Sequence, residues 1–129
     1  MSEVRPILAR RVLVVDDNED ALEMLAEVLR AAGHEVRGAA DGPSALELAS
    51  EFRPEVAVLD LGLPLMDGYE LASRLRLQLG GFCPVLVALS GYGQESDRAR
   101  STAAGFALHL VKPLETSELL AAIDRQMPF

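Results

Sequence analysis

Short runs of hydrophobic residues alternate along the chain with stretches in which hydrophobic residues recur every three or four positions. Residues 12–15 form the first run, and their β-branched, wholly apolar character is typical of a strand that is buried on both faces. Comparable runs follow, the first of them weaker than the rest, at residues 34–39, 56–59, 85–89 and 107–111. We therefore predict five strands.

The stretches between these runs predict helices. In the first of them Leu22, Leu25 and Leu29 share one helical face, and Gly33 follows where a helix commonly ends. Turn residues and similar spacing predict further helices at residues 42–52, 67–79, about 94–104, and from 115 or 116 onward. Each predicted strand is thus followed by a helix.

This alternation predicts an α/β fold. Strands that are apolar on both faces and alternate with helices form a parallel sheet that helices cover on two sides. Residues 1–10 carry mixed charge and a proline, so we expect an N-terminal arm followed by one domain over residues 11–127. The length of 129 residues suits a single domain.

Composition narrows the functional classes. The formal net charge is −8, from 20 acidic against 12 basic residues, and the basic residues form no cluster, so direct nucleic-acid binding is not expected. A single cysteine, Cys83, excludes a disulfide framework and a four-cysteine zinc site. No apolar run approaches the ~20 residues that span a membrane. We expect a cytoplasmic protein, or a part of a larger one, with no membrane partner.

Four of the five predicted strands end in residues that act on phosphate or metal. In an open parallel sheet, ligands bind beyond the carboxyl ends of the strands. Three carboxylates brought together there repel one another unless a cation intervenes. Mg²⁺, or Mn²⁺ in its place, suits such oxygen ligands. The expected ligands are the carboxylates of Asp17 and Asp60, that of Asp16 either directly or through water, and the backbone carbonyl of Gly62.

The remaining residues at the strand ends suit a phosphoryl group. Asp60 stands alone at its strand end, where one carboxylate oxygen can bind metal while the other attacks phosphorus. Phosphoryl transfer needs mainly positioning and neutralisation of the equatorial oxygens. The Lys112 ammonium, the Ser90 hydroxyl and backbone N–H groups near Gly91 are the groups expected to do this.

These motifs resemble the receiver domains of bacterial two-component response regulators. The resemblance covers about residues 11–125. Each motif is weak alone, but their order and spacing are specific. The motifs are Val14-Val15-Asp16-Asp17-Asn18, Asp60 with Pro64 and Met66-Asp67-Gly68, Leu89-Ser90-Gly91, and Val111-Lys112-Pro113.

The resemblance implies a doubly wound, flavodoxin-like sheet with strand order 2-1-3-4-5. It makes Asp16 and Asp17 the acidic metal pair, Asp60 the phosphoacceptor, Ser90 the switch hydroxyl and Lys112 the phosphate-binding lysine. It implies a cis Lys112–Pro113 bond. It also implies a phosphohistidine donor on a histidine kinase or phosphotransfer protein. We expect a self-phosphorylating and self-dephosphorylating switch in a phosphorelay, not an enzyme acting on other substrates.

His109 departs from the family pattern, which usually has Tyr or Phe three residues before the lysine. We expect its side chain on the outer surface of the fifth strand, and the resemblance alone does not predict its part in the switch. Two segments, from Ala88 to Gly93 and from Gly105 to Pro113, resemble receivers attached to hybrid sensor kinases. The chain is then either such a receiver from a longer protein or a stand-alone regulator, for which Met1 and the arm argue mildly.

Alternative interpretations remain for the same residues. Taken singly, the acids could be helix caps or turn residues. A magnesium-dependent phosphatase would also use an aspartate nucleophile, but it usually has a second acid two residues later, where this chain has Gly62. A receiver that is never phosphorylated would be a constitutive binding module. The leading hypothesis is a phosphorylation-controlled switch that binds a downstream protein through its fourth helix, fifth strand and fifth helix.

Overall fold

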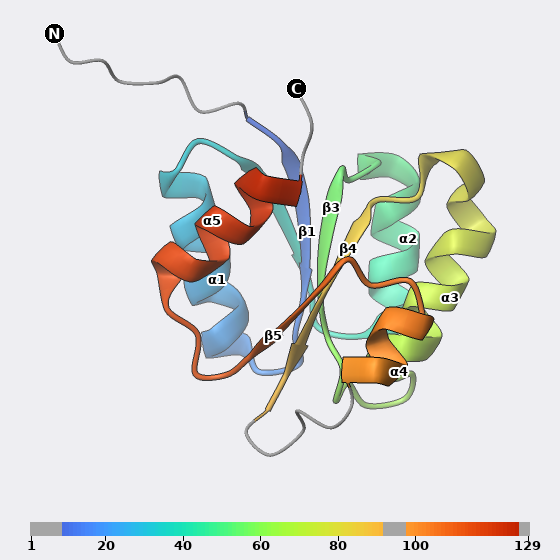
Figure 1. The fold of residues 1–129 in the computed structure, drawn as a ribbon. Coiled ribbons are helices and arrows are strands. Elements are labelled where there is room, and N and C mark those ends of the chain that lie inside the picture. Colours follow the sequence, from blue (N-terminus) through green and yellow to red (C-terminus); the bar gives the residue numbers. More distant parts are fainter. Residues whose placement is uncertain (1–8, 92–97, 127–129) are drawn as a thin grey trace, which may run out of the picture.

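The computed structural model describes residues 9–91 and 98–126, and these form a doubly wound α/β fold (Figure 1). All strand pairs are parallel, and the sheet order is β2-β1-β3-β4-β5, which confirms the predicted architecture. The strands are β1 (Arg11–Val15), β2 (Glu35–Ala39), β3 (Val56–Asp60), β4 (Val85–Ser90) and β5 (Leu108–Val111). The carboxyl ends of β1 and β3 are therefore neighbours.

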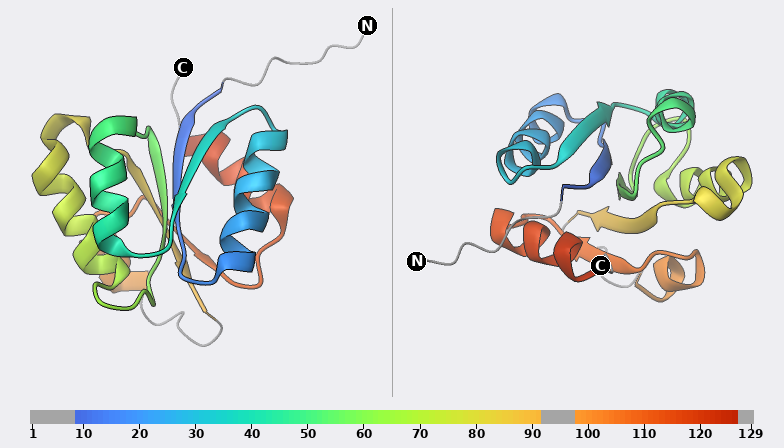
Figure 2. Two further views of the ribbon diagram at one scale, coloured as in Figure 1. Left: turned by 180° about the vertical axis from the view of Figure 1, so that it is seen from behind. Right: turned by 90° about the horizontal axis from the view of Figure 1, so that it is seen from above.

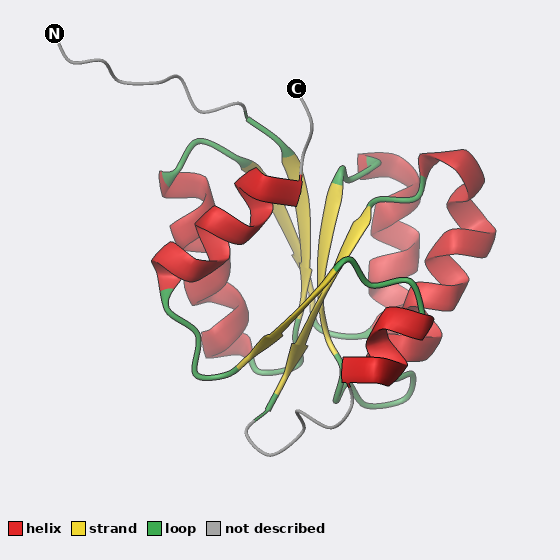
Figure 3. Ribbon diagram, viewed as in Figure 1, coloured by secondary structure: helices red, strands yellow, loops and turns green. Residues whose placement is uncertain are grey.

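Helices form the two outer layers, and the strands form the layer between them (Figure 3). The helices are α1 (Glu19–Ala31), α2 (Gly42–Phe52), α3 (Gly68–Leu79), the 3₁₀ turn η1 (Gly80–Phe82), α4 (Arg98–Ala103) and α5 (Thr116–Gln126). α1 and α5 cover one face, while α2, α3 and α4 lie on the other (Figure 2). The predicted start of the fourth helix near residue 94, and most of the predicted N-terminal arm, lie outside the described residues.

The central strands are buried on both faces because both faces are apolar. In β1, Val12 and Val14 pack in the cluster beneath α1 and α5, and Leu13 and Val15 pack in the cluster beneath α2 and α3. All four are fully buried. Burial of apolar area on both sides stabilises the sheet and fixes the polar residues that follow each strand at one edge. None of the helices in the described part of the chain has the length and apolar character needed to cross a membrane.

Polar side chains just after the strand ends begin the helices. Asn18 accepts a hydrogen bond from the Ala21 N–H at the start of α1, and Asp67 accepts one from the Glu70 N–H at the start of α3. Such N-caps satisfy amide groups that lack partners within the helix. They also explain why acidic and amide residues are dense at this edge without all being ligands.

Gly68 allows α3 to begin directly against the end of β3. A Cβ atom at Gly68 would lie 2.7 Å from the Asp60 carbonyl oxygen and 2.8 Å from the Leu61 Cα. Both are backbone atoms, so they cannot give way as a flexible side chain would. The Gly68 N–H also donates to the Leu61 carbonyl at 3.2 Å. The backbone of Asp60 is thereby tied to the first turn of α3.

Candidate functional site

Three acidic side chains meet at the carboxyl ends of β1 and β3. One oxygen each of Asp16, Asp17 and Asp60 lies within 4.8 Å of the other two. Asp16 is fully buried, the Asp60 side chain is 13% exposed, and Asp17 is exposed. The three acids, which the sequence places at two strand ends, therefore form one cluster in the structure.

Lys112 joins two of these acids. Its Nζ atom donates to Asp16 Oδ2 at 2.9 Å and to Asp60 Oδ2 at 3.3 Å. The residue follows β5, and its backbone N–H donates to the Ser90 carbonyl at 2.9 Å, which fixes the start of the side chain. The Lys112–Pro113 peptide bond is cis, the isomer that the resemblance implies. Lys112 is also the only lysine in the sequence.

The electrostatics of the site favour a cation. Burial raises the pKa of the Asp60 carboxyl above its usual value, against the lowering effects of the Gly62 N–H and Lys112, and the charge of Asp16 adds to the rise. Burial disfavours the charged form of Lys112, but its hydrogen bond with Asp16 and the charge of Asp60 outweigh this and raise its pKa. The Lys112 ammonium bonds two of the three acids, so among these four described groups the negative charges outnumber the positive.

The donor set fits a divalent metal. Mg²⁺ prefers hard oxygen ligands at about 2.1 Å, so opposite ligands lie roughly 4.2 Å apart. One carboxylate oxygen of each acid in the trio lies within 4.8 Å of the other two, so the three can converge on a single ion. The exposed Asp17 leaves open positions for water or a substrate oxygen. These three acids can bind a metal ion.

Gly62 and Gly91 flank the cluster. The Gly62 N–H donates to Asp60 Oδ1 at 2.9 Å, so the loop after β3 orients the Asp60 carboxylate. Gly62 is exposed, and its carbonyl remains a predicted metal ligand. Gly91 is half-buried and directly follows Ser90 at the end of β4, where its N–H remains a predicted phosphate contact.

His109 does not lie on the outer surface of the sheet, so that prediction was wrong. Its Nε2 atom is 2.7 Å from Ser90 Oγ, and Ser90 is fully buried. The reason is the alternation of β5: Leu108 and Leu110 pack on the side of α1 and α5, so the residue between them points to the opposite face. There α4 covers part of the edge strand, and His109 is half-buried.

Ser101 is a residue of this region that the sequence did not reveal. It is 1% exposed within α4, and its Oγ atom lies 2.9 Å from His109 Nδ1. Its carbonyl accepts a hydrogen bond from the Phe106 N–H at 3.0 Å. A serine in a polar helix carries no pattern that predicts burial, so only the packing of the folded protein identifies it.

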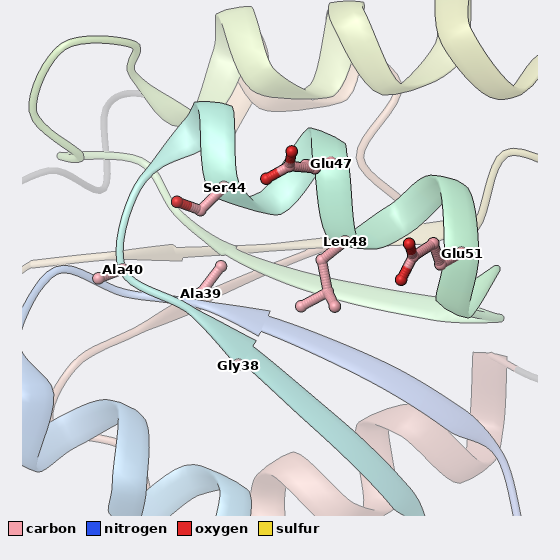
Figure 4. A pocket seen from close by; sticks show the side chains of 7 residues that line it. All are labelled: Gly38, Ala39, Ala40, Ser44, Glu47, Leu48 and Glu51. Carbon is pink, nitrogen blue, oxygen red and sulfur yellow. The ribbon is translucent and has the colours of Figure 1, made fainter.

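A separate hollow of about 490 Å³ lies between β2 and α2 (Figure 4). Its lining includes Gly38, Ser44 and the exposed acids Glu47 and Glu51, and Leu48 points from α2 toward the strands. None of the acid trio or Lys112 lines it. The hollow is therefore distinct from the acidic cluster.

A family model described as the response regulator receiver domain matches residues 12–124. The chain belongs to this family. Among curated proteins, the transcriptional regulatory protein PrrA of Mycobacterium bovis is 41% identical over 117 residues, which cover 91% of this chain and 49% of PrrA. PdtaR of Mycobacterium tuberculosis is 36% identical, with 89% of this chain and 55% of PdtaR covered. The receiver chain thus spans about half the length of these relatives.

Solved receiver structures share the fold. The chemotaxis response regulator CheY4 of Vibrio cholerae is 32% identical, with a TM-score of 0.82. The match covers 93% of this chain and 100% of CheY4. A CheY-like receiver domain protein of Methanospirillum hungatei is 27% identical with a TM-score of 0.83, over 92% of this chain and 94% of the other. These findings make the chain a signalling domain of the two-component type.

Proposed function

We propose that this receiver domain is a phosphorylation-controlled switch in which Asp60 accepts a phosphoryl group from a phosphohistidine. The observation that carries the proposal is the bridge from Lys112 Nζ to both Asp16 and Asp60, with Asp17 beside them. It surrounds one partly exposed carboxylate with an amine and with metal-binding acids. The proposed donor is a histidine kinase or a phosphotransfer protein, and the proposed location of the domain is the cytoplasm.

In the proposed step, a carboxylate oxygen of Asp60 attacks phosphorus. The P–O bond forms as the P–N bond of phosphohistidine breaks, and the bonding electron pair stays on the donor imidazole. Lys112 neutralises one equatorial oxygen, while Ser90 and the Gly91 N–H donate to another. Mg²⁺, or Mn²⁺ in its place, would be held by Asp16, Asp17, Asp60 and the Gly62 carbonyl, and would neutralise charge on the phosphoryl oxygens. Attack by water on the acyl phosphate would reset the switch.

The proposed output is a protein–protein contact. A phosphoryl group adds about −1.5 to −2 charge and new acceptor oxygens, which bias the surrounding elements toward one of two arrangements. We place the responding surface on α4, β5 and α5, which adjoin Ser90 and Lys112 along the chain and in the sheet. With a net charge of −8, the domain itself is not proposed to bind nucleic acid.

The test is phosphorylation by a small donor. Incubation with acetyl phosphate and Mg²⁺ should add the mass of one phosphoryl group, and the Asp60→Asn variant should gain none. Asp67→Asn is the matched control, because Asp67 is an exposed aspartate near the site whose N-cap role asparagine retains. A wild-type protein that gains no mass, or an Asp60→Asn variant that still does, contradicts the proposal.

A further inference from the structure

Ser90, His109 and Ser101 form a continuous hydrogen-bonded chain from the phosphorylation site to α4. Ser90 Oγ lies 2.7 Å from His109 Nε2, and His109 Nδ1 lies 2.9 Å from Ser101 Oγ. Both serines are essentially inaccessible to solvent, at 0% and 1% exposure. Because both ring nitrogens are engaged, the imidazole connects a residue at the end of β4 with a residue in α4.

The direction of one hydrogen bond sets the direction of the other. A neutral imidazole donates from one nitrogen and accepts at the other. If the Ser90 hydroxyl donates to Nε2, then Nδ1–H donates to Ser101. If Nε2–H donates to Ser90, then Nδ1 accepts from the Ser101 hydroxyl. Either arrangement is compatible with the two observed distances. The same packing therefore admits two proton positions on the ring.

Phosphorylation selects between these two arrangements. A Ser90 hydroxyl that donates to a phosphoryl oxygen has no second proton for Nε2. Its oxygen can still accept, so Nε2 must carry the proton. A hydrogen bond to an ionised oxygen is roughly twice as strong as one between neutral groups, so the phosphoryl group prevails over the ring as the acceptor of the Ser90 proton.

We infer that His109 is a positioning residue that transmits the state of Asp60 to α4 by reversing this hydrogen-bonded chain. The inference rests on the proposed phosphorylation of Asp60. In the inferred resting state the Ser90 hydroxyl donates to Nε2 and the ring proton is on Nδ1. On phosphorylation the ring loses the Nδ1 proton to water and takes a proton from water at Nε2, so its charge is unchanged. Ser101 then becomes a donor where it was an acceptor, and the buried part of α4 adjusts to the rotated hydroxyl. Phe at this position makes no side-chain hydrogen bond, and Tyr has a single hydroxyl, so neither can connect both serines in this way.

The ¹⁵N resonances of the imidazole rings read the proton positions directly. The sequence has only two histidines, and His34 serves as an internal reference because its Nδ1 accepts from the Arg10 N–H at 3.1 Å, remote from the acid cluster. With Mg²⁺ and beryllium fluoride as the phosphoryl mimic, His109 should show at least a tenfold excess of the Nε2–H form. The His34 signals should not change.

Two results separate failure of this inference from failure of the proposed function. If acetyl phosphate adds no mass at Asp60, the proposed function and the inference fall together. If the mass increases but His109 keeps its proton on Nδ1, is protonated at both nitrogens, or shows no change on addition of the mimic, only the inference is overturned.

Variants test the connection to α4. Ser101→Ala should accept the phosphoryl group at a rate within twofold of wild type. However, beryllium fluoride changes the backbone amide chemical shifts of residues 100–103, and in this variant the size of those changes should be at least threefold smaller. Ser101→Thr, which keeps a hydroxyl, should restore them. Ser73→Ala, an exposed serine on α3, is the control and should respond as wild type does. Undiminished α4 shifts in a folded Ser101→Ala protein contradict the inference.

Discussion

Lys112 balances the two most buried carboxylates of the acidic cluster. Its ammonium lies 2.9 Å from Asp16 and 3.3 Å from Asp60, and the same position would place it against a phosphoryl oxygen on Asp60. A fixed positive charge that needs no rearrangement is most effective where charge develops in the transition state. At the scale of single residues, Lys112 is therefore the group most directly linked to the rate of the proposed reaction.

Replacing Lys112 by alanine should slow phosphorylation by acetyl phosphate roughly 10²–10³-fold, the usual effect of removing one such stabilising group. The rate is measured by intact mass against time at fixed Mg²⁺ concentration. Arg125→Ala, which removes an exposed cation from the last turn of α5, is the control and should leave the rate unchanged. A Lys112→Ala protein with the wild-type rate would remove Lys112 from the mechanism.

Leu65 has a strained backbone in the loop after β3. Its φ is +67° although it carries a side chain, and it is 88% exposed. Leu65→Gly should raise the free energy of unfolding by about 0.5–1 kcal/mol, because glycine adopts this conformation without strain. Leu77→Gly is the control, because Leu77 is 84% exposed but lies in a helix. This change should lower the free energy of unfolding by about 1 kcal/mol. Urea unfolding measures the free energy of unfolding of both variants. A change of the same sign in the two variants would contradict the prediction.

His109 shows where residue-level prediction from sequence fails. Asp16, Asp17, Asp60 and Lys112 could be placed together because each follows a strand, and strand ends of a parallel sheet share one edge. The contacts of His109 depend on a short polar helix, α4, whose packing leaves little hydrophobic signal. Motifs at strand ends are encoded locally, whereas a contact between an edge strand and a polar helix is not.

At the scale of elements, the start of α3 determines where the acceptor carboxylate lies. The Gly68 N–H bonds to the Leu61 carbonyl, and the absence of a Cβ lets the helix touch the backbone at Asp60. The side chain of Asp60 is in turn held by the Gly62 N–H. The Asp60 side chain, the loop after β3 and the start of α3 are thus held together by these contacts.

Gly68→Ala should therefore displace α3 or the end of β3. We expect a loss of about 1–3 kcal/mol in the free energy of unfolding, the typical cost of inserting atoms into a packed contact, and slower phosphorylation. Gly81→Ala is the matched control, because no atom lies within 4 Å of its added Cβ. Denaturant unfolding together with the acetyl phosphate assay checks both effects. A Gly68→Ala protein that matches Gly81→Ala would show that the contact is not restrictive.

A helix or strand was easier to predict when its apolar residues form a continuous or regular pattern that stands out from the polar residues around it. β1 and β3 are continuous apolar runs, and both were located to within a residue. β2 gave a weaker signal because it is an edge strand with only Val36 and Ala39 buried. Asp41 and Asp67 cap α2 and α3 in the structure. Short acceptors of this kind before a helix act locally, so a sequence can signal them.

At the scale of the whole molecule, an uncompensated acidic cluster lies at one end of an otherwise apolar sheet. Asp16 and Asp60 are largely buried, and one ammonium faces three carboxylates. A ligand that binds only the folded protein stabilises it by an amount set by its concentration relative to its dissociation constant. Metal binding at this cluster should therefore be visible in global unfolding.

Mg²⁺ at about 100 times its dissociation constant should raise the free energy of unfolding by about 2.7 kcal/mol. Asp17→Asn should lose most of this gain. In EDTA the same change should have little effect on the free energy of unfolding, because Asp17 is exposed. Asp20→Asn alters another exposed acid in the first turn of α1 and should respond to Mg²⁺ as wild type does. Chemical unfolding with Mg²⁺ or with EDTA gives the comparison. An unchanged response of Asp17→Asn would place the metal elsewhere.

The single lysine of this chain gives chemists a site-directed handle on the native sequence. Apart from an α-amino terminus, an acylating or reductively methylating reagent finds its one side-chain amine between Asp16 and Asp60. The other members of the twelve Lys and Arg residues are all arginines, which are inert to such reagents. The rate at which the unmutated protein is labelled would thus report how tightly the amine is held. An isotopically labelled methyl group attached to the amine would give one assigned NMR signal without any substitution.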